Sequence, residues 1–335
     1  MTENFINLIR SAAQEGVSDI HFVRGKIYRR LDGTLSPFPS RPEYSPAAVR
    51  EMAAALIDPR ENPLPASALP MLQAQGAVDF ALAVDEIRLR VNIYRSEQEL
   101  AAAVRILPAS FPSVAELRLE RIARRLDTSL EDRAGGLLLV TGSTGSGKST
   151  TLASLMDWLL RRPRHAVTLE DPVEYIFPPG HEASFISRRE LGRDFFSFSQ
   201  GIRQSLREMP DLLLVGEIRD EETMTAALMA AESGILVLAS LHTGTAPGAV
   251  ERVAGFYAPD RQPVILRQLS QVITAVIAQR LAPTPRGRRA IYEILTATPA
   301  VRNLVRVGNT AQLVSVIVSG AADGMITFEQ SLSRL

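Results

Sequence analysis

Residues 142–150 read Gly-Ser-Thr-Gly-Ser-Gly-Lys-Ser-Thr and directly follow the apolar run Leu137–Val140. The next segment, Thr151–Leu160, has helical spacing, so the pattern GxxxxGK[ST] lies in the strand-loop-helix setting that it requires. Glycines let the main chain wrap closely around phosphate oxygens, so that successive N–H groups and a helix N-terminus point at the anion. The stretch therefore predicts a phosphate-binding loop made of Gly142, Ser143, Thr144, Gly145, Ser146, Gly147, Lys148, Ser149 and Thr150.

Composition limits the classes of protein to consider. The chain has 335 residues, 46% of them hydrophobic, which is enough for about two domains with separate cores. It has no cysteine, which excludes a disulfide scaffold, a cysteine-based zinc site and a cysteine nucleophile. The 37 basic and 37 acidic side chains balance, which argues against a general nucleic-acid binder. Short arginine clusters, such as Arg161, Arg162 and Arg164, are interpreted as solvated loop ends.

Lysine is rare in this chain, which contains 35 arginines and only two lysines, Lys26 and Lys148. Lys148 stands where a slim ammonium is needed and a wider guanidinium fits poorly. In such loops the lysine reaches the β- and γ-phosphates of a nucleotide, and the next hydroxyl, here Ser149, is placed to ligate Mg²⁺. A glycine-rich turn without a ligand is the alternative interpretation. At the chain's own residue frequencies the pattern arises by chance about once in a thousand such chains, so we favour the phosphate loop.

Residues 1–108 are expected to form a small α+β domain. Helical spacing runs over residues 3–14, and Lys26 to Leu35 is typical of a hairpin. Alternating apolar residues predict antiparallel strands over 78–84 and 86–94, and a further strand is expected over 101–107.

Residues 109–113 are expected to be a linker, and residues 114–335 a second domain that starts with a helix from 114 to about 130. Short continuous apolar runs then alternate with segments of helical spacing, which indicates a parallel sheet covered by helices, and hence an α/β fold. The runs are 137–140, 166–169, 212–215 and 235–239. From about residue 262 the chain is expected to be mostly helical, with one strand over 290–295.

Polar and acidic residues follow each apolar run. Ligands on open α/β sheets bind outside the carboxyl ends of the strands. Those ends carry Glu170, Asp171 and Glu174 after the second run, Glu217 after the third and His242 after the fourth. Carboxylates there can hold a magnesium hydration shell or accept a proton from water, and a histidine can sense a γ-phosphate. One such glutamate alone is more often a helix cap or a surface charge, but the shared position beside one phosphate loop favours the functional interpretation.

Four motifs resemble those of one protein family. GSTGSGKSTTLA, TLEDPVEYIF, LLLVGEIRD and LASLHTGTA resemble the Walker A, Asp box, Walker B and His box of the secretion ATPase superfamily, which drives type IV pili, type II secretion and related machines. They occur in the family's order over about residues 137–247, and SDIHF at 18–22 and RLRVN at 88–92 resemble its N-terminal segments. The resemblance implies a RecA-like P-loop ATPase core, a smaller PAS-like α+β N-terminal domain and a homohexamer that uses ATP and Mg²⁺.

The resemblance also implies roles by position. Glu174 would be the general base that activates water, and Glu217 the Walker B acid that acts through the Mg²⁺ hydration shell, with Glu170 and Asp171 as weaker metal candidates. An arginine that reaches the γ-phosphate only when domains or subunits close makes hydrolysis depend on that closure. The family has four arginines near the phosphates, and the matching positions are Arg90, Arg105, Arg203 and Arg207.

The segment Thr298–Arg306, TPAVRNLVR, resembles one associated with pilus retraction ATPases of the PilT type. An amphipathic helix with Val301, Leu304 and Val305 inward explains the same residues, and the two interpretations are compatible. We expect a cytoplasmic retraction motor held at the inner face of the membrane by a platform protein, with no specific nucleic-acid partner. A pilus assembly, type II secretion or competence motor, a regulator without turnover and a nucleic-acid motor are the alternatives.

Overall fold

The computed structural model describes residues 3–31, 33–39, 44–58, 68–107, 110–177, 183–285 and 287–335. Contacts divide the chain into two compact units. The N-terminal unit comprises the chain up to Ser110 together with Asp171–Ile176 and Glu190–Asp194. The C-terminal unit comprises Phe111–Glu170, Phe177–Arg189 and Phe195–Leu335. The sequence prediction had placed both short segments in the second domain.

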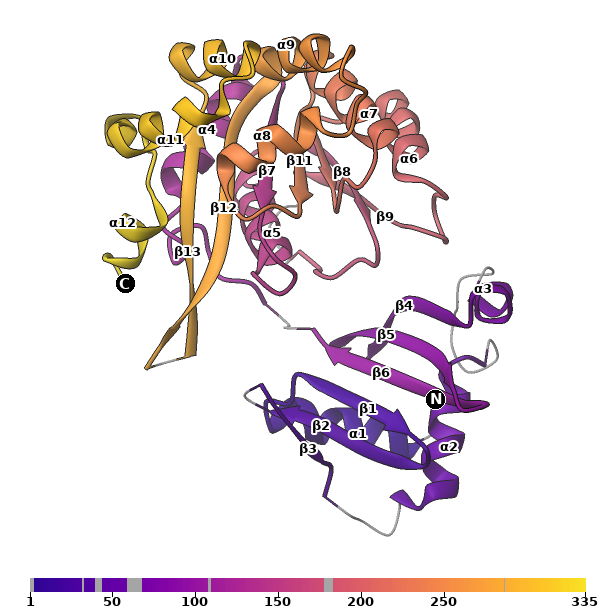
Figure 1. Ribbon diagram of the computed structural model, residues 1–335. Helices are drawn as coiled ribbons and strands as arrows, with labels where there is room; N and C mark the ends of the chain where they lie inside the picture. The colour runs from indigo at the N-terminus through magenta and orange to yellow at the C-terminus, as the bar shows by residue number, and fades with distance from the viewer. Residues whose placement is uncertain are drawn as a thin grey trace. The chain divides into compact units, whose positions relative to one another are not determined.

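The N-terminal unit is built on a six-stranded sheet in the order β3-β2-β1-β6-β5-β4, and its paired strands are antiparallel (Figure 1). The strands are β1 (Asp19–Val23), β2 (Lys26–Leu31), β3 (Thr34–Pro37), β4 (Ala77–Val84), β5 (Ile87–Ser96) and β6 (Glu99–Ile106). The helices are α1 (Glu3–Gln14), α2 (Pro46–Ala55) and α3 (Ala68–Gln75).

The alternation predicted for β5 decides which side chains face the core of this unit. Leu89, Val91 and Ile93 are fully buried and belong to one apolar cluster with residues of α1 such as Phe5. The residues between them point to the opposite face of the sheet because successive side chains of a strand alternate. Arg90 is one of these and remains partly exposed.

The C-terminal unit contains a seven-stranded sheet in the order β13-β12-β7-β11-β10-β8-β9. Parallel pairs connect β12, β7, β11, β10 and β8, and β13 pairs antiparallel to β12. The strands are β7 (Gly136–Thr141), β8 (His165–Glu170), β9 (Phe185–Glu190), β10 (Leu212–Val215), β11 (Leu236–Leu241), β12 (Ile273–Thr284) and β13 (Gly287–Thr296).

Helices surround this sheet, as its continuous apolar strands predict. On β7, Leu138 and Val140 share a buried cluster with α4 and α5, and Leu137 and Leu139, which point the other way, are also fully buried. The helices are α4 (Glu120–Glu131), α5 (Lys148–Leu159), α6 (Phe198–Ser205), η2 (Leu206–Glu208), α7 (Glu221–Glu232), α8 (Ala246–Ala254), α9 (Gln262–Val272), α10 (Pro299–Arg306), α11 (Thr310–Ser319), η3 (Gly320–Asp323) and α12 (Phe328–Leu332).

Two secondary-structure predictions in this unit were wrong. The helix expected from residue 114 begins only at Glu120, and the C-terminal part is less helical than expected because Ile273–Thr284 forms strand β12. The first seven residues of β12 are all buried. A strand buried on both faces has a continuous apolar run, which periodicity cannot distinguish from a buried helix.

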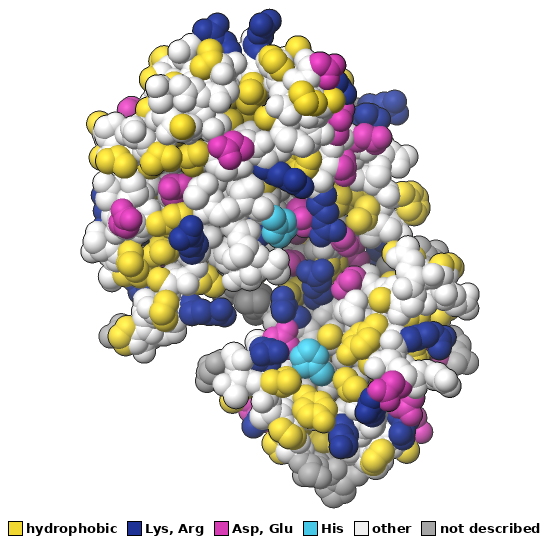
Figure 2. All heavy atoms as spheres, viewed as in Figure 1, with side chains coloured by type: hydrophobic (Ala, Val, Ile, Leu, Met, Phe, Trp, Pro, Cys, Tyr) yellow, Lys and Arg dark blue, Asp and Glu magenta, His cyan; other side chains and the backbone are white. Residues whose placement is uncertain are grey.

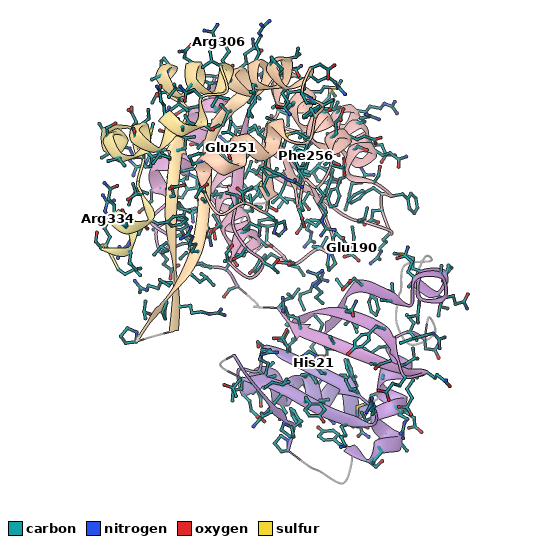
Figure 3. All side chains as sticks on the ribbon, viewed as in Figure 1. His21, Glu190, Glu251, Phe256, Arg306 and Arg334 are labelled. Carbon is teal, nitrogen blue, oxygen red and sulfur yellow. The ribbon has the colours of Figure 1, made fainter. Side chains whose placement is uncertain are left out.

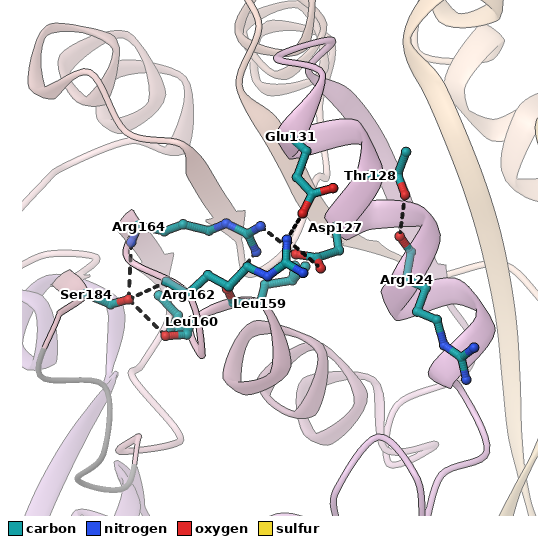
Figure 4. A network of polar contacts seen from close by, with 9 residues as sticks. All are labelled: Arg124, Asp127, Thr128, Glu131, Leu159, Leu160, Arg162, Arg164 and Ser184. Carbon is teal, nitrogen blue, oxygen red and sulfur yellow. Dashed lines mark hydrogen bonds and ion pairs between the residues drawn. The ribbon is translucent and has the colours of Figure 1, made fainter.

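The arginines at 161–164 are not all exposed to solvent (Figure 4). The Arg164 side chain is only 8% exposed; it forms an ion pair with Asp127 of α4, and its Nη1 donates to the Leu159 carbonyl at 2.7 Å. Arg162, which is 55% exposed, pairs with Asp127 and Glu131. The expectation of solvated loop ends was therefore wrong for Arg164, which ties α4 to the end of α5.

No helix in the described part of the chain is both long and apolar enough to cross a membrane. On the face drawn in Figure 2, basic and acidic side chains are interspersed on each unit. This arrangement matches the zero net charge of the sequence.

Candidate active site

The loop between β7 and α5 has the backbone that its glycines predict. Gly142, Gly145 and Gly147 have φ angles of 151°, 77° and 88°, in the region that side chains rarely adopt. A Cβ atom on Gly142 would lie 2.4 Å from the Gln279 carbonyl oxygen, and one on Gly147 would lie 2.8 Å from Gln279 Nε2. Gly142 and Gly147 are thus favoured both by backbone angle and by the closeness of β12, and Gly145 by its backbone angle alone.

Gln279 holds this loop and was missed by the sequence analysis. Its side chain is 2% exposed, its Nε2 donates to the Ser146 carbonyl at 2.7 Å, and its Oε1 accepts from the Thr151 hydroxyl at 2.7 Å. One side chain from β12 therefore joins the loop to the first turn of α5. Its only sequence signal was a polar residue within an apolar run, in a segment predicted to be helical.

Gln279→Leu is expected to loosen the loop. The change leaves the Ser146 carbonyl and the Thr151 hydroxyl buried without their partner, which should lower the free energy of unfolding by about 2 kcal/mol. Affinity for a fluorescent ATP analogue should fall, because the loop must then be ordered on binding. The matched control is Gln271→Leu, at an exposed position on α9. Parental stability and affinity in the Gln279 variant would contradict this role.

Lys148 is the first residue of α5 and is 9% exposed. Its Nζ donates to the carbonyls of Gly142 at 2.8 Å and Ser143 at 3.1 Å, and lies 3.5 Å from His242 Nδ1. The ammonium is therefore folded back over its own loop. An anion at the N-terminus of α5 would compete with these neutral carbonyls for the lysine charge, and a charge-assisted bond is the stronger one.

Glu217 and His242 meet beside this lysine. His242 Nε2 lies 2.8 Å from Glu217 Oε1, and Arg219 Nε lies 2.8 Å from the same oxygen. Burial favours a higher pKa for Glu217, but the hydrogen bond from Arg219 and the charges of His242 and Arg219 outweigh it and lower the pKa. The carboxylate is therefore ionised at neutral pH. The other ring nitrogen of His242, Nδ1, faces the Lys148 ammonium at 3.5 Å.

Cross-links between strand ends hold these groups in place. Thr141 at the end of β7 accepts the Thr243 N–H at 2.7 Å, and its hydroxyl donates to the Thr243 carbonyl at 2.9 Å. The Ile218 N–H donates to the Ser240 carbonyl at 3.0 Å. These bonds fix the residues that flank His242 and Glu217, so the structure brings the predicted phosphate loop, Glu217 and His242 together.

The Asp-box residues are divided between the two units. Glu170 ends β8 in the C-terminal unit, whereas Asp171 and Glu174 belong to the segment that groups with the N-terminal unit. Glu174 Oε1 lies 3.9 Å from Arg90 Nη1 of β5. Arg88 Nη2 donates to the Val173 carbonyl at 2.9 Å. The predicted base is thus bound to the sheet of the N-terminal unit.

The four predicted arginines form two pairs. Arg90 and Arg105 are direct cross-strand partners on β5 and β6, and carboxylates offset their repulsion, since Arg105 Nε lies 2.8 Å from Asp19 Oδ1. Arg203 and Arg207 lie on α6 and η2 of the C-terminal unit, and both are exposed. Each pair therefore belongs to one unit.

The loop residues fit a nucleotide phosphate and Mg²⁺. Ser146 Oγ is buried without a hydrogen-bond partner among the described residues, and the first N–H groups of α5 have no acceptor within the helix. Ser149 is exposed and Glu217 is ionised, as a metal site requires. The described residues contain no cluster of three or more potential metal-ligating side chains. Mg²⁺ commonly uses one or two carboxylates together with phosphate oxygens, so the donor set matches that ion.

The segment that resembled the retraction motif forms α10. Val301 and Val305 are buried and Leu304 is partly buried, as the amphipathic interpretation predicts. Arg302 Nη1 donates to the carbonyls of Ser270 at 2.7 Å and Gln271 at 2.6 Å near the C-terminal end of α9. A structural role therefore accounts for this arginine.

Known proteins resemble the chain over nearly its whole length. The family model described as "Type II/IV secretion system protein" matches residues 2–327. The type IV pilus retraction ATPase PilT of Pseudomonas aeruginosa is 35% identical over 334 residues, covering 98% of this chain and 92% of its own. The twitching motility protein of Neisseria gonorrhoeae is 38% identical, and the match covers 88% of this chain and 76% of that protein. The uncharacterized protein YggR of Escherichia coli K12 is 37% identical, and the match covers 98% of this chain and 97% of that protein.

Solved structures agree with these relatives. The crystal structure of the pilus retraction motor PilT with bound ADP superposes with a TM-score of 0.82 at 34% identity, covering 98% of this chain and 96% of its own. The structure of the ATPase DotB of Legionella pneumophila gives a TM-score of 0.76 at 25% identity and covers 98% of this chain and 94% of its own. The expected α/β fold, a RecA-like core with a smaller N-terminal domain, is confirmed.

Proposed function

Because this chain belongs to the family of type II/IV secretion system proteins, we propose that it is a motor ATPase that hydrolyses ATP to power retraction of type IV pili. The observation that carries this proposal is the phosphate loop with Lys148 beside the Glu217–His242 pair, in a chain similar to PilT over 98% of its length. We also infer a homohexamer at the cytoplasmic face of the inner membrane, where it would act on a platform protein of the pilus machine.

The residues divide the chemical work as follows. Lys148 and the loop N–H groups bind and neutralise the phosphates, which orients the γ-phosphate for in-line attack. Ser149 and Glu217 would hold Mg²⁺, which supplies charge stabilisation when bound. Glu174 takes the proton of the attacking water.

Charge that develops on the phosphoryl oxygens is offset by arginines. Arg90 and Arg105 would contribute from the N-terminal unit, and Arg203 and Arg207 from the C-terminal unit. The proposed base and two of these arginines belong to the N-terminal unit. Movement that accompanies turnover would drive the platform protein and remove pilin subunits from the pilus base.

A pilus assembly or type II secretion motor is the second candidate. Type II secretion system protein E of Aeromonas hydrophila is 33% identical over 285 residues, which cover 83% of this chain. PilT of Pseudomonas aeruginosa is 35% identical over 334 residues, which cover 98% of this chain. The wider match to PilT favours retraction.

The deciding experiment deletes the gene in its host and examines surface pili and twitching. Retraction predicts excess pili and no twitching, and complementation with the wild-type gene should restore the parental phenotype. Loss of pili would instead support assembly. Parental piliation and motility would exclude both pilus roles.

A further inference from the structure

Glu190, the last residue of β9, is a buried carboxylate to which the function proposed above assigns no role (Figure 3). Glu190 is 7% exposed. Its Oε2 accepts the Val173 main-chain N–H at 3.2 Å, and the Ala81 main-chain N–H of strand β4 also bonds to the carboxylate. β4 lies at the edge of its sheet, so the carboxylate occupies part of the position of a further strand.

A turn holds Glu190 rigidly in this position. Its carbonyl accepts the N–H groups of Arg193 at 3.2 Å and Asp194 at 2.8 Å. Its own N–H donates to Asp194 Oδ2 at 2.9 Å. Residues 190–194 thus form a closed turn that groups with the N-terminal unit and presents one carboxylate to Val173.

Burying this carboxylate is costly. Burial raises the pKa of Glu190, and the two main-chain hydrogen bonds and the charges of Arg193 and Arg88 offset only part of that effect. An apolar side chain would fill the same space without the desolvation cost. The specific contribution of a carboxylate here is its two hydrogen bonds, one to the Asp-box segment and one to β4.

Both main-chain polar groups of Val173, its N–H and its carbonyl, are hydrogen-bonded to side chains. Glu190 holds its N–H, and Arg88 Nη2 holds its carbonyl at 2.9 Å. The carbonyl of Val173 belongs to the peptide bond that leads into Glu174, whose side chain extends to within 3.9 Å of Arg90. Fixing both ends of the residue before Glu174 restricts where that side chain can point.

We propose that Glu190 is a positioning residue. Together with Arg88 it clamps the Val173 backbone, and this holds the Glu174 carboxylate where it can accept a proton from the attacking water. The inference rests on the proposed function, because it assumes that Glu174 is the base. Glu190 acts only through the Asp-box backbone and does not touch the nucleotide. The clamp also attaches the base to the N-terminal unit.

The test compares Glu190→Ala and Glu190→Gln with the parent in steady-state ATP hydrolysis. Alanine removes both acceptors, and a misplaced base should lower kcat about 10- to 100-fold. The KM for ATP and the affinity for a fluorescent ATP analogue should stay within about twofold, since the phosphate loop is untouched. Glutamine keeps an oxygen acceptor and should recover most of kcat. The matched control is Glu99→Ala, a partly exposed carboxylate of the same unit that pairs with Arg50.

A double-mutant cycle separates positioning from general damage. In a Glu174→Gln background, Glu190→Ala should change kcat by less than about twofold, because the group that it positions is already absent. An equal loss in both backgrounds, or parental kcat in the single variant, would overturn the proposal. If Glu174→Gln itself turns over like the parent, the assignment of the base fails instead.

A second variant keeps the proposal testable if Glu190→Ala does not fold. Arg88→Gln weakens the grip on the Val173 carbonyl and should lower kcat at least about threefold at unchanged KM. A parental kcat in Arg88→Gln would refute the clamp.

Discussion

Lys148→Ala is expected to abolish ATP hydrolysis, with a loss in kcat of at least about 100-fold. The ammonium already lies in the loop, 2.8 Å from the Gly142 carbonyl and 3.5 Å from His242. A bound γ-phosphate would replace the carbonyls as its partner, so alanine removes a positive charge that needs little reorganisation. Phosphate release at saturating ATP measures the loss, and binding of a fluorescent ATP analogue shows whether affinity falls with it.

The chain offers a matched control for this experiment. Lys26, the only other lysine, is exposed at the start of β2, and Lys26→Ala should hydrolyse ATP at the parental rate. Lys148→Arg separates charge from shape: the wider guanidinium should not restore turnover, although the charge is kept. A Lys148→Ala protein that keeps more than about a tenth of the parental kcat would contradict the assignment of the loop.

The phosphate loop could be predicted from the sequence because its chemistry is local. Two glycines, a lysine and a hydroxyl must stand at fixed spacing between a strand and a helix, and the structure shows positive φ angles at both of these glycines, Gly142 and Gly147. Strands β7, β8, β10 and β11 followed from their continuous apolar runs, whereas β9 has no such run and was not predicted. The same argument failed for β12, because a run such as Ile273–Gln279 has no period that identifies a strand.

Contacts that are distant in the sequence could not be predicted in this way. Gln279 bonds to Thr151 and Ser146 across 128 and 133 residues, and no local pattern records such a pairing. The burial of Arg164 depends on Asp127, which lies 37 residues earlier. Glu190 lies 17 residues after Val173 of the Asp-box segment, so the grouping of both with the N-terminal sheet followed from neither composition nor periodicity.

Glu174→Gln is expected to lower kcat by about 100- to 10,000-fold while nucleotide binding is retained. Glutamine has nearly the same shape as glutamate but cannot accept the proton of the attacking water. Glu174 lies in the N-terminal unit, 3.9 Å from Arg90, so its replacement leaves the phosphate loop and Lys148 unchanged. The expected signature is a fall in kcat at parental affinity for a fluorescent ATP analogue. Glu99→Gln, at a partly exposed carboxylate of the same unit that pairs with Arg50, should leave kcat at the parental value.

Comparison with Glu217→Gln distinguishes the two carboxylates. Glu217 is ionised beside the loop and would act through Mg²⁺, so its amide variant should need more Mg²⁺ for half-maximal activity. The Mg²⁺ dependence of Glu174→Gln should match the parent, because a proton acceptor does not bind the metal. If Glu174→Gln turned over at the parental rate, another group would have to take the proton, or the chain would be a nucleotide-binding regulator. If both variants shifted the Mg²⁺ requirement equally, Glu174 would be acting on the metal rather than on the water.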